Sequence, residues 1–423
     1  MKPHILHLVD LSLVGGIQAS FVNTIAHPRF AERYRASVQN VGAGPVLDSW
    51  AGRVGACGGT LLDGNRRVAQ QGRRGGAGRF RPLADRVRRG LQTVLTVARL
   101  RPHVVLLWSI RPRPGFVRIA RALGARVVVW DRGVSWLRSP SPSVTRGFAM
   151  ADAILCNSHA ARRMLQLRWK VESRIDICLN AVRPDALAHD VTPRDLPDGQ
   201  PIRLGFVGRL IPLKGAGIAV AAVARLASDL NVELHIAGTG SEEQFLRALA
   251  QRLGVDSRVV FHGLVSDVAA FYRDIDLFVC PSLREPFGLV SVEAQGNGVP
   301  ALVSGVDGLP ETISAGRTGM AIEPRMPLSR YAEFTANVAD VPPLVYFPRR
   351  DEVGSPLALD PQDLASAIRA VAADPAAYRA MSAAAINHAR TAFGFDHHVA
   401  CATAVLDRVL ATRPGITHNP SHV

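Results

Sequence analysis

The sequence lacks long hydrophobic runs and has few cysteines. No stretch of about 18 apolar residues occurs, and the longest candidate, 217–227, is interrupted by Arg225, so we expect no membrane-spanning helix. The five cysteines are scattered without CxxC spacing, which argues against a disulfide framework or a zinc site and favours a reducing, cytoplasmic compartment. Residues 1–12 lack the charged and apolar regions of a secretory signal, so export by that route is not expected.

Acidic residues are scarce in the first half of the chain. Residues 1–200 hold 31 Lys and Arg against 13 Asp and Glu, a net charge of +18, whereas 201–423 hold 19 against 22, a net charge of −3. Much of the excess lies in 66–90, with nine arginines and one acid. Such a segment attracts an anionic membrane, a phosphorylated acceptor or nucleic acid, or it is a solvated arginine-rich loop. Nucleic acid is disfavoured, because Phe80 is the segment's one aromatic residue and stacking needs a series.

Short β-branched segments alternate with helical patterns along the whole chain, which is typical of βαβ units and parallel sheets. A length of 423 residues favours two domains. The expected strands are 5–10, 36–42, 104–108, 126–131 and 153–158 in the first half, and 202–208, 232–238, 258–263, 277–282 and 300–304 in the second. The predicted fold class is therefore α/β, with two doubly wound parallel-sheet domains.

The domain boundaries follow from composition. A stretch rich in Pro and Asp without periodicity separates the two strand series, and a second Pro-rich stretch interrupts the second half. The predicted parts are an N-terminal domain at 1–183, a linker at 184–201, a C-terminal domain at 202–394 with an insertion at about 325–357, and a C-terminal helix and tail at 395–423. Two helices, at 359–393 and 396–411, are expected to close the chain.

Parallel sheets bind ligands at the carboxyl ends of their strands, and polar signals gather there in this sequence. In FVGRLIPLKG (206–215), Arg209 and Lys214 place two cations on one loop. Beside a diphosphate they would neutralise a leaving group whose charge grows in the transition state. The GxxxxGK[ST] loop of nucleotide triphosphatases is absent, and solvated surface charges are the alternative interpretation.

Two glycine-rich turns carry weaker signals. In LVGGIQAS (13–20), Gly15 and Gly16 precede a predicted helix, which permits either close approach of a phosphate or a tight turn without a ligand. AGTGSEE (237–243) begins like a dinucleotide-binding motif, but the third glycine is missing. A close-packed turn is the favoured interpretation.

The densest candidate site is the segment 284–311. Gly288, Leu289 and Val290 open a helix whose free amides can hold phosphate oxygens. Glu293 falls about a turn and a half into this helix, where it could accept hydrogen bonds from ribose hydroxyls, and Glu285 stays on the loop. A capping or surface carboxylate is the alternative for each glutamate, but apolar residues surround both.

These motifs resemble those of family 4 glycosyltransferases, the retaining enzymes of the GT-B fold also described as glycosyl transferases group 1. The resemblance covers nearly the whole chain and is more specific in the second half. The segments that carry it are REPFGLVSVEA (284–294), FVGRLIPLKG (206–215), IAGTGSEE (236–243), VVFHGLVSDVAAFY (259–272), PALVSGVDGLPETI (300–313), LVGGIQAS (13–20), DAILCNSHAARRML (152–165) and ICLNAVRPD (177–185).

The resemblance implies two Rossmann-like domains facing a cleft, and a nucleotide-sugar donor held mainly by the second domain, with no metal or other cofactor. The implied roles place Arg209 and Lys214 on the donor diphosphate, Glu285 on the sugar and Glu293 on the ribose. The other implied donor contacts are Gly15 and Gly16 toward the diphosphate from the first domain, Gly208 in the Arg209 loop, His262 and Gly263 near the nucleobase, and Gly288, Leu289 and Val290 on the phosphates.

The sequence departs from the family pattern in two places. The family often has a histidine after a first-domain strand, where this chain has VVVWDRGVSW (127–136). A residue of 130–133 is expected to replace it, with Asp131 or Arg132 as candidates and Asp131 as the catalytic assignment. The insertion at 325–357 replaces a short connection, and the sequence suggests no function for it.

The predicted function is sugar transfer from a nucleotide-sugar donor to a glycan or lipid-linked acceptor, with retention at the anomeric carbon, in the synthesis of cell-surface polysaccharide, lipopolysaccharide or glycolipid. The basic first half agrees with peripheral attachment to the inner face of the cell membrane. Two alternatives remain open, which are a nucleotide-sugar epimerase of the same fold and a non-catalytic nucleotide-sugar-binding protein.

Overall fold

The computed structural model describes residues 1–42, 44–62, 83–182, 186–187 and 190–412. Most of the arginine-rich segment, part of the predicted linker and the C-terminal tail lie outside these residues. None of the helices among the described residues is long and apolar enough to cross a lipid bilayer.

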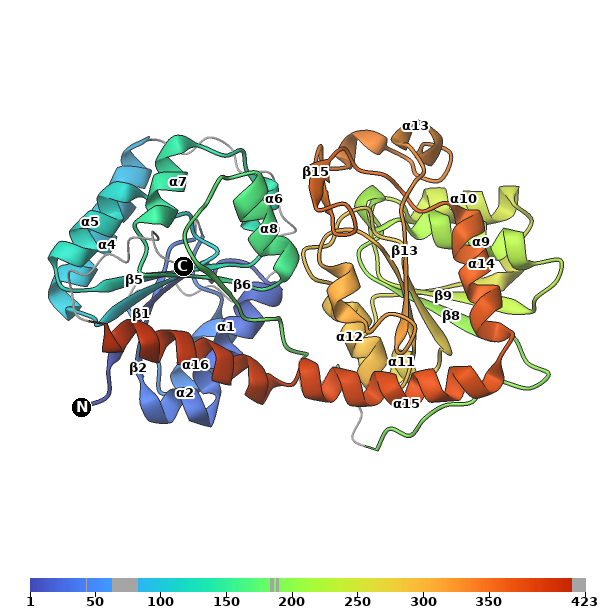
Figure 1. Ribbon diagram of the computed structural model, residues 1–423, viewed down its shortest axis with the longest axis horizontal. Coiled ribbons are helices and arrows are strands. Elements are labelled where there is room, and N and C mark those ends of the chain that lie inside the picture. The colour runs from blue at the N-terminus through green and yellow to red at the C-terminus, as the bar shows by residue number, and fades with distance from the viewer. Residues whose placement is uncertain (43, 63–82, 183–185, 188–189, 413–423) are drawn as a thin grey trace. The chain divides into compact units, whose positions relative to one another are not determined.

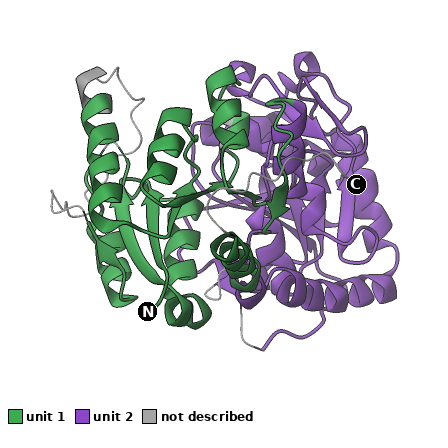
Figure 2. Cartoon of the chain, turned by 60° about the vertical axis from the view of Figure 1, so that its left-hand side comes forward, with its two compact units in different colours: residues 1–157, 168–178, 398–423 green, residues 158–167, 179–397 purple. Residues whose placement is uncertain are grey.

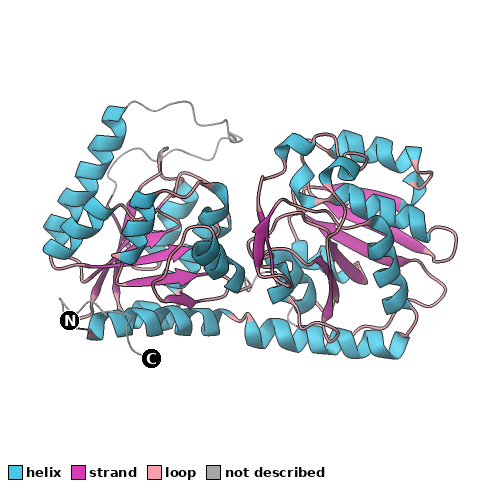
Figure 3. Ribbon diagram, turned by 45° about the horizontal axis from the view of Figure 1, so that its top comes forward, coloured by secondary structure: helices cyan, strands magenta, loops and turns pink. Residues whose placement is uncertain are grey.

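The chain forms two compact units, which Figure 2 shows in different colours. Unit 1 consists of residues 1–157, 168–178 and 398–423, and unit 2 consists of 158–167 and 179–397. The units therefore begin and end at other residues than the sequence predicts. Helices flank the strands in both of them (Figure 3).

Unit 1 contains a seven-stranded parallel sheet with the order β3-β2-β1-β4-β5-β6-β7. Its strands are β1 (His4–Val9), β2 (Arg35–Asn40), β3 (Thr60–Leu61), β4 (Val104–Trp108), β5 (Arg126–Asp131), β6 (Ala153–Cys156) and β7 (Ile175–Ile177). Its helices are α1 (Gly16–Ala26), α2 (Pro28–Arg33), α3 (Asp48–Ala56), α4 (Leu83–Leu100), α5 (Pro114–Ala122), α6 (Val134–Leu137), α7 (Pro142–Ala149) and, from His398 on, α16 (Phe395–Ala411). The strand order reverses between β1 and β4.

Unit 2 repeats this topology in a six-stranded parallel sheet with the order β10-β9-β8-β11-β12-β13. Figure 1 labels β8, β9 and β13 of this sheet. Its strands are β8 (Ile202–Val207), β9 (Val232–Ala237), β10 (Val259–Gly263), β11 (Leu277–Cys280), β12 (Ala301–Ser304), β13 (Gly319–Ile322) and the hairpin pair β14 (Val345–Phe347) and β15 (Glu352–Gly354). Its α-helices are α8 (His159–Leu167), α9 (Ala216–Leu226), α10 (Glu243–Arg252), α11 (Val268–Arg273), α12 (Leu289–Gly296), α13 (Leu328–Tyr331), α14 (Pro361–Ala372) and α15 (Pro375–Ala392), and its short 3₁₀ helices include η2 (Pro212–Lys214), η3 (Asp256–Arg258), η4 (Leu309–Thr312) and η5 (Val338–Asp340). The strand order reverses between β8 and β11, so both units are Rossmann-like and doubly wound, as predicted.

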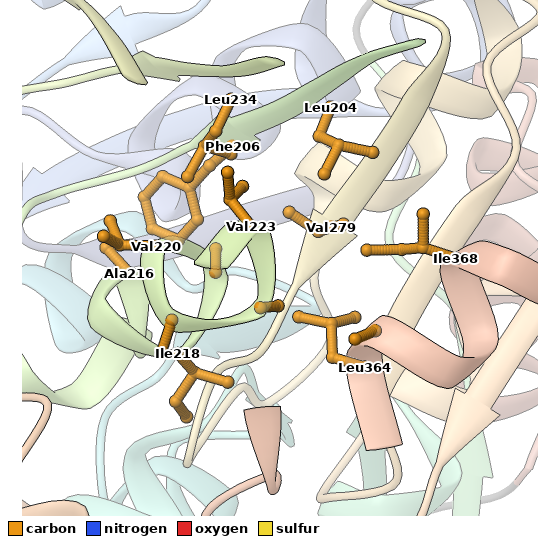
Figure 4. Close-up of a cluster of buried hydrophobic side chains, with 14 of the residues drawn as sticks. Leu204, Phe206, Ala216, Ile218, Val220, Val223, Leu234, Val279, Leu364 and Ile368 are labelled. Atoms are coloured by element: carbon orange, nitrogen blue, oxygen red, sulfur yellow. The ribbon is translucent and has the colours of Figure 1, made fainter. Parts of the chain in front are cut away.

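The core of unit 2 explains why its strands read as nearly continuous apolar runs. On β11, Leu277 and Val279 pack with helices α9 and α14 on one face of the sheet, as Figure 4 shows for Val279, Leu364 and Ile368. The alternate residue, Phe278, packs with α11 and α12 on the other face. Because side chains alternate between faces, a strand covered on both sides needs apolar residues at every position.

Unit 1 has an aromatic core under its last helix. The rings of Trp108 and Trp130, on adjacent strands, lie 4.6 Å apart between centroids, and His398 of α16 stacks on Trp130 at 5.3 Å. Tyr34 donates a hydrogen bond to the carbonyl oxygen of Thr403 at 3.2 Å. These contacts make α16 part of this unit from His398 onward.

The prediction of two closing helices is wrong, because three are present. Residues 359–393 are divided into α14 and α15. The Asp374 carboxylate accepts a hydrogen bond from the Ala377 amide at 2.9 Å and caps α15, and Pro375 occupies the first position of that helix. An Asp-Pro pair is a helix-start signal that the continuous apolar periodicity obscured.

The short strands were also missed. Strand β3 has two residues, Asp176 interrupts the three residues of β7, and β13 begins at Gly319, so none of them forms the dense apolar run that marks β11. The Pro-rich stretch at 325–357 is likewise more regular than expected, because it contains α13 and the antiparallel pair of β14 and β15.

Candidate functional site

Three loops of unit 2 meet at the point where the strand order reverses. Strands β8, β11 and β12 are neighbours in a parallel sheet, so the loops that follow them leave the same edge. Arg209 and Lys214 follow β8, Glu285 follows β11, and Asp307 follows β12. The carboxyl edge of an open parallel sheet at its switch point is the usual ligand site of this architecture.

The centre of this site is an ion pair between Lys214 and Glu285. Their side chains are only 19% and 16% exposed. Burial lowers the pKa of the Lys214 amine, but attraction by Glu285 outweighs it, so the pKa lies above its ordinary value. The amine is therefore protonated at neutral pH. The exposed Arg209 is a second positive charge nearby, and its repulsion lowers the pKa of the Lys214 amine slightly.

The sequence predicts Lys214 on the diphosphate and Glu285 on the sugar, and the structure brings the two side chains into direct contact. Two glycines permit this approach. At Gly215, which has a φ of +69°, a Cβ would lie 2.2 Å from the Pro281 carbonyl oxygen. At Gly288, which has a φ of +101°, a Cβ would lie 2.5 Å from the Leu309 side chain. The loops after β8 and β11 thus depend on residues without side chains.

Helix α12 begins at this site directly after Gly288, as the sequence predicts. No side chain caps its N-terminus, and its first turn has no acidic residue. Amides at such a helix start can bind an anion, with the helix dipole in support. Binding of phosphate by Leu289 and Val290 stays a prediction.

Glu293 lies on α12 and is buried, with 6% of its surface exposed. The Tyr272 hydroxyl lies 3.3 Å from Glu293 Oε2 and 3.1 Å from the Val290 carbonyl oxygen. A hydroxyl has a single proton, so it donates to one of these acceptors at a time. The Tyr272 hydroxyl is therefore within hydrogen-bond reach of the carboxylate of the predicted ribose ligand, and sequence analysis did not select Tyr272.

Asp307 was missed by sequence analysis, although it holds the backbone of Glu285. Its Oδ2 accepts a hydrogen bond from the Glu285 amide at 3.0 Å, and its Oδ1 accepts one from the Tyr346 amide at 2.7 Å. The Gly308 amide donates to the Glu285 carbonyl at 3.1 Å. Asp307 is completely buried and has a left-handed φ of +49°. The available signal was the Asp-Gly pair itself, which favours such turns.

Arg284 is a second missed candidate, because it directly precedes Glu285. Burial lowers the pKa of its guanidinium, while Asp307 and Glu285 raise it. Its Nε is buried and has no hydrogen-bond partner among the residues that the structure describes. A buried donor at a switch point, with a formal positive charge, suits an anionic ligand.

Glu311 is a carboxyl group of this unit with a raised pKa. Burial raises its pKa to about 7, although hydrogen bonds from two amides lower it. Those amides belong to His159 and Ala160 at the start of α8, each 2.7 Å from a carboxylate oxygen. Glu311 therefore caps α8.

The predicted nucleobase residues lie at the end of β10. His262 is exposed, and its Nε2 lies 3.0 Å from Nδ1 of His235 on β9. The carbonyl oxygen of Gly263 accepts a hydrogen bond from the Gly238 amide at 2.7 Å. The close packing predicted for the AGTG turn is present, since a Cβ at Gly238 would lie 1.8 Å from the Gly208 carbonyl oxygen.

The unit 1 candidates occupy the carboxyl ends of β1 and β5. Helix α1 starts at Gly16, after Gly15, without a side-chain cap or an acidic first turn, and a Cβ at Gly16 would meet no atom within 4 Å. Asp131 is buried and accepts a hydrogen bond from the Ser135 hydroxyl at 2.8 Å. Arg132 is also buried and donates to Ser20 at 2.9 Å. Burial lowers the pKa of Arg132 to about 10, so it stays protonated at neutral pH.

A metal site is not evident in the described part of the chain, where no three His, Cys, Asp or Glu side chains are grouped to hold an ion. The groups that converge on the switch point are instead Arg209, Lys214, Arg284, the α12 amides and Glu285. Cations and amides suit phosphate oxygens, and a carboxylate suits hydroxyl groups.

Comparison with known proteins finds a family match over part of the chain. The family model described as "Glycosyl transferases group 1" matches residues 192–333. A relative described as an uncharacterized glycosyltransferase, from Methanocaldococcus jannaschii, is 39% identical over 124 residues, which cover 29% of this chain and 32% of that protein. The chain spans about a third of the length of the first curated relatives it matches.

Solved structures match the chain nearly end to end at low identity. A glycosyltransferase from Rickettsia africae aligns with a TM-score of 0.71 and 15% identity, covering 97% of this chain and all of the other. The Anabaena protein Alr3699/HepE in complex with UDP aligns with a TM-score of 0.66 and 17% identity, covering 96% of this chain and all of the other. These likenesses show the GT-B fold.

Proposed function

We propose that the protein transfers a sugar from a nucleotide-sugar donor to an acceptor hydroxyl, with retention at the anomeric carbon. The match of the glycosyl transferases group 1 model to residues 192–333 supports this proposal. The observation that carries this proposal is the contact of Lys214 and Glu285 beside the start of α12. In this arrangement the Lys214 amine and the α12 amides are available to a diphosphate, and the adjacent Glu285 carboxylate is available to a sugar. The UDP complex of a protein with the same fold supports a nucleotide donor.

The donor's own leaving group performs the chemistry in this proposal. The bond from the anomeric carbon to the diphosphate breaks, and the acceptor oxygen bonds to the same face of that carbon. The acceptor proton passes to the departing diphosphate oxygen. Lys214 and Arg209 stabilise the negative charge that develops there, and Glu285 orients the sugar. Glu293 holds the ribose.

A donor screen tests the function directly. The full chain is heated with a panel of nucleotide sugars and with the free nucleoside diphosphates, because a ligand that binds the folded state raises the melting temperature. We expect one donor class at about 100 times its Kd to stabilise the protein by about 2.7 kcal/mol. That donor is then incubated with and without acceptor extracts. Release of nucleoside diphosphate coupled to a new glycoside supports transfer, epimerised donor supports the epimerase, and binding without turnover supports a binding protein.

The acceptor is proposed to be a glycan or lipid-linked molecule of cell-surface synthesis, reached from the inner face of the membrane. Helix α4 of unit 1 supports this location. Val87, Leu91 and Leu95, spaced by four residues, are 61%, 58% and 60% exposed. Residues 86–130 contain ten arginines and no acidic residue. An exposed apolar stripe within a basic region fits an anionic bilayer better than a free polyanion.

Vesicle binding should therefore depend on both lipid charge and the stripe. We expect the protein to co-sediment with vesicles that contain about one third phosphatidylglycerol at low salt, and to lose most of this binding when Leu91 and Leu95 are changed to Asn. The control is Leu264→Asn, because Leu264 is 85% exposed in unit 2. Equal binding of the double variant and the wild type would contradict the assignment to α4.

A further inference from the structure

The insertion at 325–357 contacts the loop that carries Lys214 directly and reaches the loop that carries Glu285 through Asp307. In its first part, the Tyr331 hydroxyl donates a hydrogen bond to the Pro212 carbonyl oxygen in η2, the short helix that ends at Lys214. In its second part, strand β14 contacts Asp307 through Tyr346. The insertion thus supports the Lys214 loop on one side and the Glu285 loop on the other.

The second contact consists of four hydrogen bonds, two accepted by the Asp307 carboxylate and two between backbone groups. Asp307 and Tyr346 form two reciprocal bonds, since the Tyr346 amide donates to Asp307 Oδ1 and the Asp307 amide donates to the Tyr346 carbonyl at 2.8 Å. The other carboxylate oxygen accepts the Glu285 amide, and Gly308 donates to the Glu285 carbonyl. Both backbone groups of Glu285 are therefore fixed by the pair 307–308.

The residue type at 307 is informative. A φ of +49° favours glycine, because a Cβ is crowded in the left-handed conformation. Aspartate nevertheless occupies the position, and both of its oxygens bond to buried amides. A carboxylate that accepts two amides gives stronger, charge-assisted bonds than a neutral acceptor would. Its contacts with Glu285 and Tyr346 thus compensate for an unfavourable backbone.

We propose that Asp307, with the backbones of Glu285 and Tyr346, forms a clasp through which the insertion sets the position of the Glu285 carboxylate for the donor sugar. Asp307 is a positioning residue in this assignment, and β14 is its anchor. The inference rests on the proposed function for its catalytic consequence. The insertion, for which the sequence suggests no function, then supports the loop that carries the Glu285 carboxylate.

Asp307→Gly tests the clasp without straining the turn. Glycine accepts the left-handed conformation, so the variant removes the carboxylate while the backbone stays favourable. The matched control is Asp351→Gly, because Asp351 lies in the same insertion with a φ of +51° and does not contact Glu285. Its carboxylate bonds to Arg163 and to the Tyr346 hydroxyl, whereas the clasp uses the Tyr346 backbone. We expect kcat for the donor to fall by about 10- to 100-fold in Asp307→Gly and to stay within about two-fold in the control.

Two further measurements separate positioning from general damage. The Kd of the nucleoside diphosphate, which lacks the sugar, should stay within about two-fold of wild type in Asp307→Gly. A double variant with Glu285→Gln should lose no more kcat than Glu285→Gln alone, since both changes act on the same carboxylate. Full kcat in Asp307→Gly, an equal loss in Asp351→Gly, or additive losses in the double variant would each overturn the clasp.

Hydrogen exchange tests the clasp independently of turnover. The amides of segment 284–288 should exchange at least about ten-fold faster in Asp307→Gly than in the wild type or Asp351→Gly, because the Glu285 amide loses its acceptor. Unchanged exchange would overturn the clasp even in an active enzyme. Faster exchange in a chain that turns over no donor would support the clasp and refute the proposed function.

Discussion

Replacing Lys214 by alanine is expected to lower donor turnover by about two to three orders of magnitude, the usual cost of losing one preorganised group that stabilises transition-state charge. Two effects combine. The departing diphosphate loses one of its two proposed cations, and Glu285, only 16% exposed, loses its ion-pair partner. An unpaired, partly buried carboxylate is costly and adopts new contacts. The measurement is kcat/KM for the donor together with the melting temperature.

Three further variants separate the loss of the cation from the loss of the ion pair. Lys214→Arg keeps a positive charge and should retain part of the activity, although a guanidinium does not reproduce the ammonium geometry. Arg209→Ala removes an exposed cation without breaking the ion pair, so a large loss of turnover there indicates a direct role on the donor. Lys2→Ala is the matched substitution in unit 1, where the exposed Lys2 amine donates a hydrogen bond to the Ala31 carbonyl oxygen at 2.9 Å, and should behave as wild type. Near-native turnover in Lys214→Ala would defeat the proposed leaving-group role.

The fold could be predicted from sequence because its strands are buried on both faces. Apolar runs such as 104–108 and 277–280 are dense and bounded, so periodicity located most strands within two residues. Edge elements such as β3 and β13 lack that density. The hairpin in the insertion escaped notice for another reason, since its strands have three residues each among several prolines.

The site could be predicted only in part. Arg209, Lys214 and Glu285 stand at strand ends, and the order of parallel strands brings such positions to one edge. The ion pair between Lys214 and Glu285 joins residues 71 positions apart, and the bond from Asp307 to Tyr346 joins residues 39 apart. No local pattern encodes such pairs, because they follow from the register of neighbouring loops. The sequence therefore predicts candidate ligand groups, but it does not reveal Tyr272, Arg284 and Asp307, which lie beside them.

Gly238→Ala is expected to destabilise unit 2 by about 3 kcal/mol, which corresponds to a fall in melting temperature of about 10 °C for a unit of this size. Gly238 has a φ of +139°, and its missing Cβ makes room for the Gly208 carbonyl oxygen. The variant must therefore strain the backbone and push away the loop that carries Arg209.

Gly254→Ala isolates the packing contribution, because Gly254 also has a positive φ, +69°, but a Cβ there would meet no atom within 4 Å. We expect only the conformational cost of about 1 kcal/mol in this control. The difference between the two variants measures how tightly the AGTG turn is packed against the β8 loop. Equal, small losses in the free energy of unfolding would mean that the turn is loosely packed. The dinucleotide interpretation of GxG would then be considered again. A large difference between the stability losses would instead show that the contact of Gly238 with Gly208 positions the loop of Arg209, the proposed diphosphate ligand.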